Sequence, residues 1–250
     1  MHRFFIKEKD IIDGNRVIID GDDFSHINLS LRLCEGDKIV VCTGDGTDYK
    51  VELVDFQKKQ VEGKIIDKSS NLAEPSINVT LAQSIPKSRN MELVVQKATE
   101  VGVSKIIPLE TGRTIVKLSG KKKEKRKARW QKIVEEAAKQ AGRGIIPRVD
   151  TVTEFDVLLE KFSNYDLIIA FWAKEKENNI RNIISSIDKK NIKDVLLLIG
   201  PEGGFAPGEI EKIKQQGGFS CGLGTRVLRT ETAGIVGVSI FLHEFNEMEV

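Results

Sequence analysis

The sequence of 250 residues predicts an α/β fold preceded by a small β-barrel. Two observations lead to this prediction. Up to about residue 70, short apolar runs are separated by turns rich in glycine and aspartate, which is typical of small barrels. From residue 76 onward, strand patterns alternate with helical ones. Such alternation indicates crossover units on a mostly parallel sheet.

The N-terminal part contains four predicted strands. They cover Arg16–Ile19, Lys38–Cys42, Tyr49–Val54 and Gln60–Ile66. Gly-Asp pairs and a Gly-Asp-Gly run lie between them, and these residues favour the backbone of tight turns. The polar segment Ser69–Pro75 is the expected linker. We therefore expect a first domain over residues 1–72 and a second over residues 73–250.

The C-terminal part supplies the alternating pattern. Strands are predicted at Ile77–Ala82, Lys105–Leu109, Leu167–Phe171, Val195–Ile199 and Phe219–Leu223. Helices are predicted at Arg89–Val101, Trp130–Ala141, Phe155–Phe162, Asn179–Ile187, from about Pro207, and at Glu231–Phe245. Ligands of such sheets bind in loops at the carboxyl ends of strands. These loops are therefore the first place to look for a functional site.

Two glycine-rich loops follow predicted strands, at Gly200–Phe205 and Gly224–Thr232. In the first loop, three glycines around the carboxylate of Glu202 would let a ligand approach backbone groups. The same glycines would equally suit a tight turn. Gly222 and Gly224 look like the start of a dinucleotide fingerprint, but position 227 is valine. The broken spacing therefore argues against a nicotinamide site at these loops, and both a ligand site of another kind and a tight turn stay open.

Gly234 and Gly237 lie inside the last predicted helix. Each glycine in a helix costs roughly 0.8–1 kcal/mol relative to alanine. Their presence indicates either that a ligand or another backbone approaches closely, or that the core is closely packed there.

The charge is unevenly distributed along the chain. Residues 1–75 carry a net charge of −4 and the remainder carries +6. Much of the excess lies in Lys121–Arg129, with seven positive residues and one negative. This run is either a solvated helix start or loop, or a patch that contacts phosphates and releases counterions on binding.

Several function classes are excluded by what the sequence lacks. No segment approaches 18 consecutive apolar residues, and charge returns at Lys7, so we expect no membrane span, no signal peptide and a cytoplasmic protein. The three cysteines lack CxxC spacing and the three histidines lack an HExxH partner, so no metal site is expected. GxSxG and GxxxxGK[ST] runs are missing, which argues against a serine hydrolase and a P-loop NTPase.

Two motifs stand out, Leu198-Ile199-Gly200-Pro201-Glu202-Gly203-Gly204 and Leu223-Gly224-Thr225-Arg226-Val227-Leu228-Arg229-Thr230-Glu231-Thr232-Ala233. Further stretches are Gln96–Val103, Gln140–Arg143 with Pro147, and His26 with Leu31-Arg32 and Gly36-Asp37. Together they resemble the 16S ribosomal RNA uridine N3-methyltransferases of the SPOUT superfamily. Where that family commonly has Ser-Glu-Arg-Ser, this chain has Thr111-Gly112-Arg113-Thr114, so only the arginine matches.

The resemblance implies a SPOUT-type α/β domain with a C-terminal trefoil knot, preceded by a small PUA-like β-barrel that binds RNA. It implies S-adenosyl-L-methionine as the methyl donor and 16S rRNA of the small ribosomal subunit as the partner. It also implies a homodimer with the site near the subunit interface. A sulfonium donor already carries a good leaving group, so no metal is required.

The resemblance also implies site residues. Those expected to bind the cofactor are Leu198, Ile199, Gly200, Pro201, Glu202, Gly203, Gly204, Leu223, Gly224, Val227, Leu228 and Thr230. Those expected to bind RNA are Arg3, Arg32, Arg113, Lys121, Lys122, Lys123, Gln140, Arg143 and Arg226. For each arginine, a surface ion pair is the competing explanation.

Two residues are candidates for catalysis. N3 of uracil carries a proton at neutral pH, so its methylation needs a base or stabilisation of a developing anion. Arg229 is the first choice for stabilisation, because a guanidinium presents several donors in one plane. Glu231 is either a base or orienting group, or a carboxylate that stabilises the first turn of its helix.

Two rival functions remain open at this stage. One is an α/β enzyme that uses a nicotinamide or another nucleotide cofactor. The other is a noncatalytic RNA-binding or ribosome-assembly protein. The identity of the bound cofactor tests the first, and methyl transfer tests the second.

Overall fold

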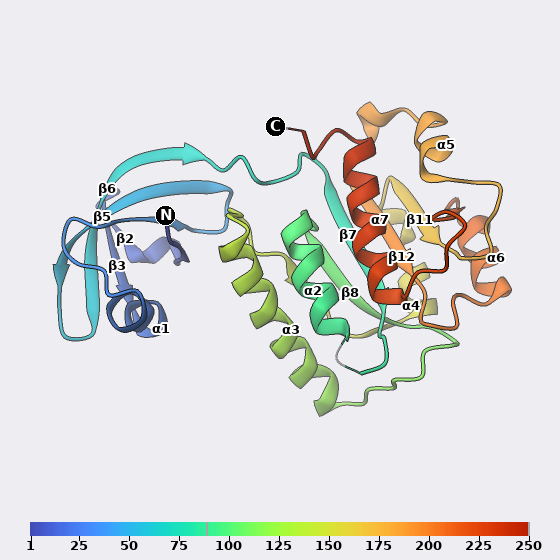
Figure 1. The fold of residues 1–250 in the computed structure, drawn as a ribbon, viewed down its shortest axis with the longest axis horizontal. Helices are drawn as coiled ribbons and strands as arrows, with labels where there is room; N and C mark the ends of the chain where they lie inside the picture. Colours follow the sequence, from blue (N-terminus) through green and yellow to red (C-terminus); the bar gives the residue numbers. More distant parts are fainter. Residues whose placement is uncertain (89, 250) are drawn as a thin grey trace. The chain divides into compact units, whose positions relative to one another are not determined.

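The computed structural model describes residues 1–88 and 90–249 (Figure 1). The chain forms two compact units. The first contains Met1–Glu74 together with Ala138–Ile146, and the second contains Pro75–Ala137 together with the described residues from Pro147 onward. A single boundary at residue 72 does not describe this division, because the segment 138–146 packs with the N-terminal unit.

The first unit is built on one sheet. Its strands are β1 (Arg3–Phe5), β2 (Ile11–Ile12), β3 (Arg16–Asp20), β4 (Lys38–Cys42), β5 (Thr47–Phe56) and β6 (Gln60–Ser70), and α1 (Gly21–Ser25) follows β3. Short helical turns lie at Glu8–Asp10 and His26–Ser30. The strand order is β1-β4-β5-β6-β3-β2, with only β1 and β4 parallel. All four predicted strands are present, and β1, β2 and α1 are too short to show a periodic pattern.

One apolar core organises this unit. Alternating residues of β3 and β5, such as Val17, Ile19 and Leu53, are buried in it with Phe4 of β1. The strands β1 and β2 end the order and are not paired with each other among the described residues. The strands of the predicted barrel therefore share one core, but no hydrogen-bond ladder between β1 and β2 closes the sheet among the described residues.

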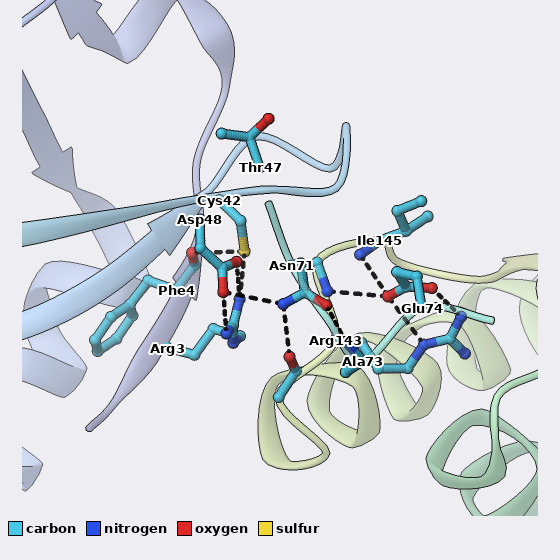
Figure 2. A network of polar contacts seen from close by, with 12 residues as sticks. Arg3, Phe4, Cys42, Thr47, Asp48, Asn71, Ala73, Glu74, Arg143 and Ile145 are labelled. Atoms are coloured by element: carbon cyan, nitrogen blue, oxygen red, sulfur yellow. Dashed lines mark hydrogen bonds and ion pairs between the residues drawn. The ribbon is translucent and has the colours of Figure 1, made fainter. Parts of the chain in front are cut away.

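The segment predicted as a linker is partly structured. Ser69 and Ser70 extend β6 and pair with β5. The amide of Asn71 donates hydrogen bonds to Asp48 Oδ2 and to the carbonyl of Gly142, both at 3.0 Å (Figure 2). These three residues therefore belong to the first unit and are not a free linker.

The second unit contains a parallel sheet. Its strands are β7 (Asn78–Ser84), β8 (Lys105–Glu110), β9 (Arg148–Val149), β10 (Thr153–Glu154), β11 (Leu167–Phe171), β12 (Asp194–Ile199) and β13 (Phe219–Cys221). The order is β10-β8-β7-β12-β11-β13, β9 pairs with β8, and every pair is parallel. The crossover architecture predicted from the alternating pattern is confirmed.

Helices connect these strands (Figure 1). They are α2 (Asn90–Val101), α3 (Lys121–Gln140), α4 (Phe155–Leu159), α5 (Ile180–Ser185), α6 (Pro207–Gln215) and α7 (Thr230–Glu244), with short turns at Phe162–Asn164 and Lys189–Asn191. On β12, Leu196 and Leu198 belong to the core cluster that includes residues of α4 and α6. Helix α7 packs against α2, β7 and β12. The predicted helix residue Arg89 lies outside the described residues.

Helix α3 begins nine residues earlier than predicted. The prediction started it at Trp130, where buried apolar residues first recur at helical spacing, whereas the helix begins at Lys121. Lysine and arginine are good helix formers, so the basic run continues the helix without an apolar face. The basic run Lys121–Arg129 therefore forms the start of a helix. Whether it also contacts phosphates is a separate question and stays a prediction.

The glycines of α7 are explained by close packing. A Cβ on Gly237 would lie 2.8 Å from Cε2 of Phe171, and a Cβ on Gly234 would overlap Oε1 of Gln83. Both neighbours are side chains of the sheet beneath the helix. Core packing, and not ligand approach, therefore accounts for these two positions. Among the described helices, none is long and apolar enough to cross a membrane.

Candidate active site

A cavity of about 470 Å³ opens at the carboxyl edge of the parallel sheet. The loops that follow β11, β12 and β13 line it, together with the first residues of α2 and α7. Its volume lies in the range of pockets that bind small molecules and cofactors. The structure brings the predicted loops to this cavity, because three neighbouring parallel strands end at this edge.

The cavity brings together most of the predicted site residues, although they lie in two separate motifs. The lining includes Ile199, Gly200, Pro201, Glu202, Gly204, Leu223, Gly224, Arg226, Val227, Leu228, Arg229, Thr230 and Glu231. Two predicted cofactor residues are not part of the lining. Leu198 is fully buried in the core cluster, and Gly203 lies next to Arg113. We therefore withdraw both from the residues proposed to touch the cofactor.

The first glycine loop needs its glycines for steric reasons. A Cβ on Gly200 would lie 2.9 Å from the backbone nitrogen of Phe205 and 3.0 Å from the carbonyl carbon of Gly204. Gly204 has φ +63°, a conformation that favours glycine, and its N–H donates to Pro201 O at 2.7 Å. The loop is a tight turn, and its glycines also border the cavity. The tight turn and the room for a ligand, considered as alternatives from the sequence, are therefore compatible with each other.

Two side chains outside the cavity support this loop. Arg113 donates from Nη1 to the carbonyl of Gly203 at 2.8 Å. Glu209 of α6 accepts from the N–H of Ala206 at 2.7 Å and from the N–H of Gly112 at 2.9 Å. Arg113 thus acts on the loop, and any contact it makes with RNA stays a prediction.

The second loop leads directly into α7. Gly224 has φ +91°, and Arg229 is the last residue before the helix. The hydroxyl of Thr230 donates to the carbonyl of Gly200 at 2.6 Å. The hydroxyl of Thr230 therefore joins the two loops, and its proton is already used within the chain.

The two candidate catalytic residues differ in exposure. Arg229 is exposed at the cavity, whereas Glu231 is only 8% exposed. Asn90, at the start of α2, donates from Nδ2 to Oε1 of Glu231 at 3.0 Å. A buried carboxylate held by an amide is placed to orient a neighbouring group, and Arg229 is placed to meet a ligand from solvent.

Five lining residues were not predicted. They are Asn90, Phe171, Trp172, Ala173 and Ala233. Phe171 to Ala173 lie at and directly after the end of a strand that the sequence predicts, so the rule of carboxyl ends would have found them. Ala233 ends the second motif but was not proposed as a site residue, whereas Asn90 carries no local signal, because the path of the chain alone brings it to the cavity.

Of the predicted RNA contacts in the first unit, Arg3 forms an internal ion pair (Figure 2). Its Nη2 donates to Asp48 Oδ2 at 2.8 Å, its Nη1 bonds to Oδ1, and its side chain is 12% exposed. Burial disfavours the charged form of Asp48, but the hydrogen bonds from Arg3 and Asn71 outweigh it and lower the pKa of the carboxyl group. We therefore withdraw Arg3 from the proposed RNA contacts.

This pair predicts a pH dependence of stability. Because the pKa of Asp48 is lowered on folding, its stabilising effect is complete above the ordinary value of about 3.9 and is lost as the pH falls through the lower folded value. Between pH 6 and pH 3, wild-type protein should lose more stability than Asp48→Asn. Hydrogen exchange of β5 and β6 amides measures this, and equal losses in both proteins would contradict the prediction.

Arg143 is likewise engaged inside the first unit. Its side chain is 2% exposed, and its Nε and Nη2 donate to the two carboxylate oxygens of Glu74 at 3.2 and 2.6 Å (Figure 2). The N–H groups of Gly144 and Ile145 also donate to Glu74, both at 3.0 Å. We withdraw Arg143 from the RNA contacts for the same reason as Arg3.

The remaining RNA candidates are accessible to different degrees. Arg32, Lys121, Lys122 and Gln140 are exposed. Lys123 is 24% exposed and lies 3.9 Å from Oε2 of Glu110, so it is a weaker candidate than its neighbours.

The cysteines and possible metal ligands add no further chemistry. Cys34, Cys42 and Cys221 are free thiols. Burial raises the pKa of Cys42 to about 11 and that of Cys221 to about 12, so neither is a ready nucleophile. In residues 1–88 and 90–249, no group of His, Cys, Asp and Glu side chains is arranged to hold a metal ion.

Comparison with known proteins agrees with this geometry. A family model described as an RNA methyltransferase domain matches residues 73–242, and an RNA methyltransferase PUA domain matches residues 19–66. The Ribosomal RNA small subunit methyltransferase E of Bacillus subtilis is 36% identical over 98% of this chain and 97% of its own. That of Mesomycoplasma hyopneumoniae is 34% identical over 94% and 96%.

Solved structures extend the comparison. The Ribosomal RNA small subunit methyltransferase E of Neisseria gonorrhoeae, bound to S-adenosyl methionine, has a TM-score of 0.83 at 28% identity over 97% of both chains. A Legionella pneumophila protein in complex with bound SAM has a TM-score of 0.83 at 30% identity over 96% of both chains. The chain described here belongs to the RNA methyltransferase family of the Ribosomal RNA small subunit methyltransferase E proteins.

Proposed function

We propose that this chain transfers a methyl group from S-adenosyl-L-methionine to N3 of one uridine in 16S rRNA of the small ribosomal subunit, a reaction of the cytoplasm. The observation that supports it most is the convergence of the loops at Gly200–Gly204 and Leu223–Thr230 on one cavity at the carboxyl edge of the sheet. Relatives of the same family are ribosomal RNA methyltransferases, and one is bound to the same donor.

The cavity fits a donor of this kind. Gly200 and Leu223 border it, and Phe171 and Trp172 add apolar surface. The missing side chain at Gly200 leaves room that a Cβ would fill with a clash. When bound, the sulfonium donor supplies an activated methyl group and a neutral leaving group. On the donor side, the residues of this chain bind it, keep water away and align its methyl group with the acceptor nitrogen.

The acceptor side of the site is formed by Arg229 and Glu231. Methylation at N3 of uracil displaces the N3 proton, for which Glu231 is the candidate acceptor at the cavity, and negative charge develops on the neighbouring carbonyl oxygens as the proton leaves. The guanidinium of Arg229 can donate to such an oxygen from the cavity rim. Glu231, fixed by Asn90, can orient the base or accept a hydrogen bond from it.

Replacing Arg229 by alanine should lower the rate of methyl transfer by roughly 10²- to 10³-fold at saturating donor and RNA, because stabilisation of the anion is lost. Arg226→Ala is the matched control, since Arg226 also lines the cavity and is proposed to bind RNA. It should raise KM for RNA and leave kcat close to wild type. A wild-type rate for Arg229→Ala in single-turnover assays would remove Arg229 from catalysis.

The first half of α3 is the proposed RNA surface of the second unit. Lys121, Lys122 and Lys125 are exposed, whereas Arg126 and Arg129 lie within 3.7 and 2.8 Å of Glu92 carboxylate oxygens. The three lysines are therefore the better contacts for phosphates, and Lys125 replaces the half-buried Lys123 in this proposal.

Neutralising the three lysines Lys121, Lys122 and Lys125 to glutamine should weaken RNA binding and flatten its salt dependence. If each contacts one phosphate, the slope of log affinity against log salt should fall by roughly 2–3. A variant with glutamine at the exposed Lys176, Lys190 and Lys193 removes the same charge elsewhere and should keep the slope. If wild type and both triple variants show the same slope of log affinity against log salt, the basic run of α3 is a solvated helix surface and does not contact phosphates.

We also propose a homodimer with the site near its interface, and a trefoil knot formed by the C-terminal part of the second unit. Helix α7 is mostly apolar, yet Val236 and Ile240 are only half-buried in the single chain. A helix of this kind is usually covered completely. Sedimentation measurements test the dimer, and a monomer at micromolar concentration would contradict it.

Methyl transfer itself is tested with small ribosomal subunits and with naked 16S rRNA. Each is incubated with the protein and isotopically labelled donor, and the RNA is digested and analysed by mass spectrometry. We expect one labelled N3-methyluridine. Donor binding without any transfer would favour a noncatalytic RNA-binding protein, and label on another base would contradict the proposed acceptor.

A further inference from the structure

Gln83 is a fully buried amide near the cavity. It lies near the carboxyl end of β7, is 0% exposed and is not part of the cavity lining. Its Nε2 donates to Oγ1 of Thr230 at 2.9 Å and to the carbonyl of Ser84 at 3.1 Å. The amide therefore joins β7 to the start of α7 from beneath the site.

Thr230 carries this connection on to the first glycine loop. Its single hydroxyl proton is donated to the carbonyl of Gly200 at 2.6 Å. The oxygen is then left as an acceptor, which is the role that Nε2 of Gln83 requires. The directions of the two hydrogen bonds agree, so the three residues form one chain that links β7, the loop after β12 and α7.

Packing alone does not explain this amide. Oε1 of Gln83 is buried and has no hydrogen-bond partner among the described residues, which makes it a costly group in a core. Room for it exists only because Gly234 has no side chain at that point. An apolar residue of similar length would fill the same space without an unsatisfied oxygen. The hydrogen bonds of Nε2 are what the amide adds.

We propose that Gln83 is a positioning residue that fixes the two loops of the methyl-donor site relative to each other. Through Thr230 it holds the carbonyl of Gly200, and with it the backbone of the first loop, in the conformation that binds the donor. Preorganisation of this kind raises affinity, because loops that are already ordered lose less conformational entropy when the donor binds. The inference rests on the proposed function, since it requires the cavity to bind the donor.

The test is donor affinity measured by calorimetry on the full chain, together with thermal unfolding. Gln83→Met keeps the length of the side chain and removes both Nε2 hydrogen bonds and the unpaired oxygen. We expect about tenfold weaker binding of S-adenosyl-L-methionine, the equivalent of losing one hydrogen bond, with an unchanged or higher unfolding temperature. A purely structural role would lower both together.

Further variants separate the steps of the chain. Thr230→Val should weaken binding as Gln83→Met does, Thr230→Ser should restore it, and the double variant Gln83→Met/Thr230→Val should be no weaker than Thr230→Val. Thr99→Val is the control, because the Thr99 hydroxyl donates to Val95 O at 2.7 Å within α2. It removes a buried hydroxyl from the same unit and should leave donor affinity unchanged.

The outcomes distinguish the inference from the function on which it rests. If wild-type protein does not bind the donor, the proposed function fails. If wild type binds and folded Gln83→Met binds equally well, or loses affinity only in proportion to its stability, the role of Gln83 is overturned. If Gln83→Met does not fold, the comparison of Thr230→Val with Thr230→Ser decides, and equal affinities there would overturn the proposal.

Discussion

Replacing Gly200 by alanine is expected to weaken binding of S-adenosyl-L-methionine by roughly 10- to 100-fold. The new Cβ would lie 2.9 Å from the nitrogen of Phe205, and backbone atoms cannot move aside as a flexible side chain can. Relieving such overpacking costs about 1–3 kcal/mol, which corresponds to this range of affinity. The loop would have to open where it borders the cavity, and calorimetry measures the loss.

Gly203→Ala in the same loop is the matched control. Its Cβ would meet Arg113 Cδ at 3.5 Å, an ordinary contact, and Gly203 does not line the cavity. Donor affinity close to wild type is expected for this variant. Equal affinities for wild type, Gly200→Ala and Gly203→Ala would show that the first loop is not part of the donor site.

Replacing Arg143 by methionine should destabilise the first unit by about 3–5 kcal/mol, the usual cost of breaking a buried ion pair from one side. The carboxylate of Glu74 would keep the N–H groups of Gly144 and Ile145 but lose its charged partner. Both tryptophans lie in the second unit, so their fluorescence does not report this change. Hydrogen exchange of β5 and β6 amides does.

The control for this variant is Arg16→Met, in the same unit. Arg16 pairs with Asp13 and Glu62 at the surface and is 47% exposed, so exchange should stay close to wild type. The two variants also distinguish the roles considered for Arg143. If Arg143→Met kept full protection of β5 and β6 but lost RNA affinity, Arg143 would be an RNA contact and not a structural residue.

The parallel sheet and the loops that border the cavity could be predicted from the sequence for a physical reason. Strands such as β11 and β12 are buried on both faces and appear as continuous apolar runs, and glycines mark the loops at their ends. Because parallel strands end at one edge, two distant motifs could be assigned to one site before any distance was known.

The side-chain partners were not predictable in the same way. Arg143 and Lys121 are both basic residues in polar stretches, yet one is 2% exposed and the other lies on the surface. What separates them is Glu74, which lies 69 residues from Arg143 in the sequence. The hydrogen bond of Gln83 could not be predicted for the same reason, because its partner Thr230 is 147 residues away in the sequence. Local patterns contain no information about such distant pairs.

A crystal structure of this chain grown with S-adenosyl-L-methionine tests the central claim most directly. We expect the donor in the cavity between the two glycine loops, with its adenosine against the backbone of Gly200–Gly204 and Leu223–Leu228 and its methyl group toward Arg229. Donor bound elsewhere on the chain, with these loops empty at saturating concentration, would contradict the assignment of the site.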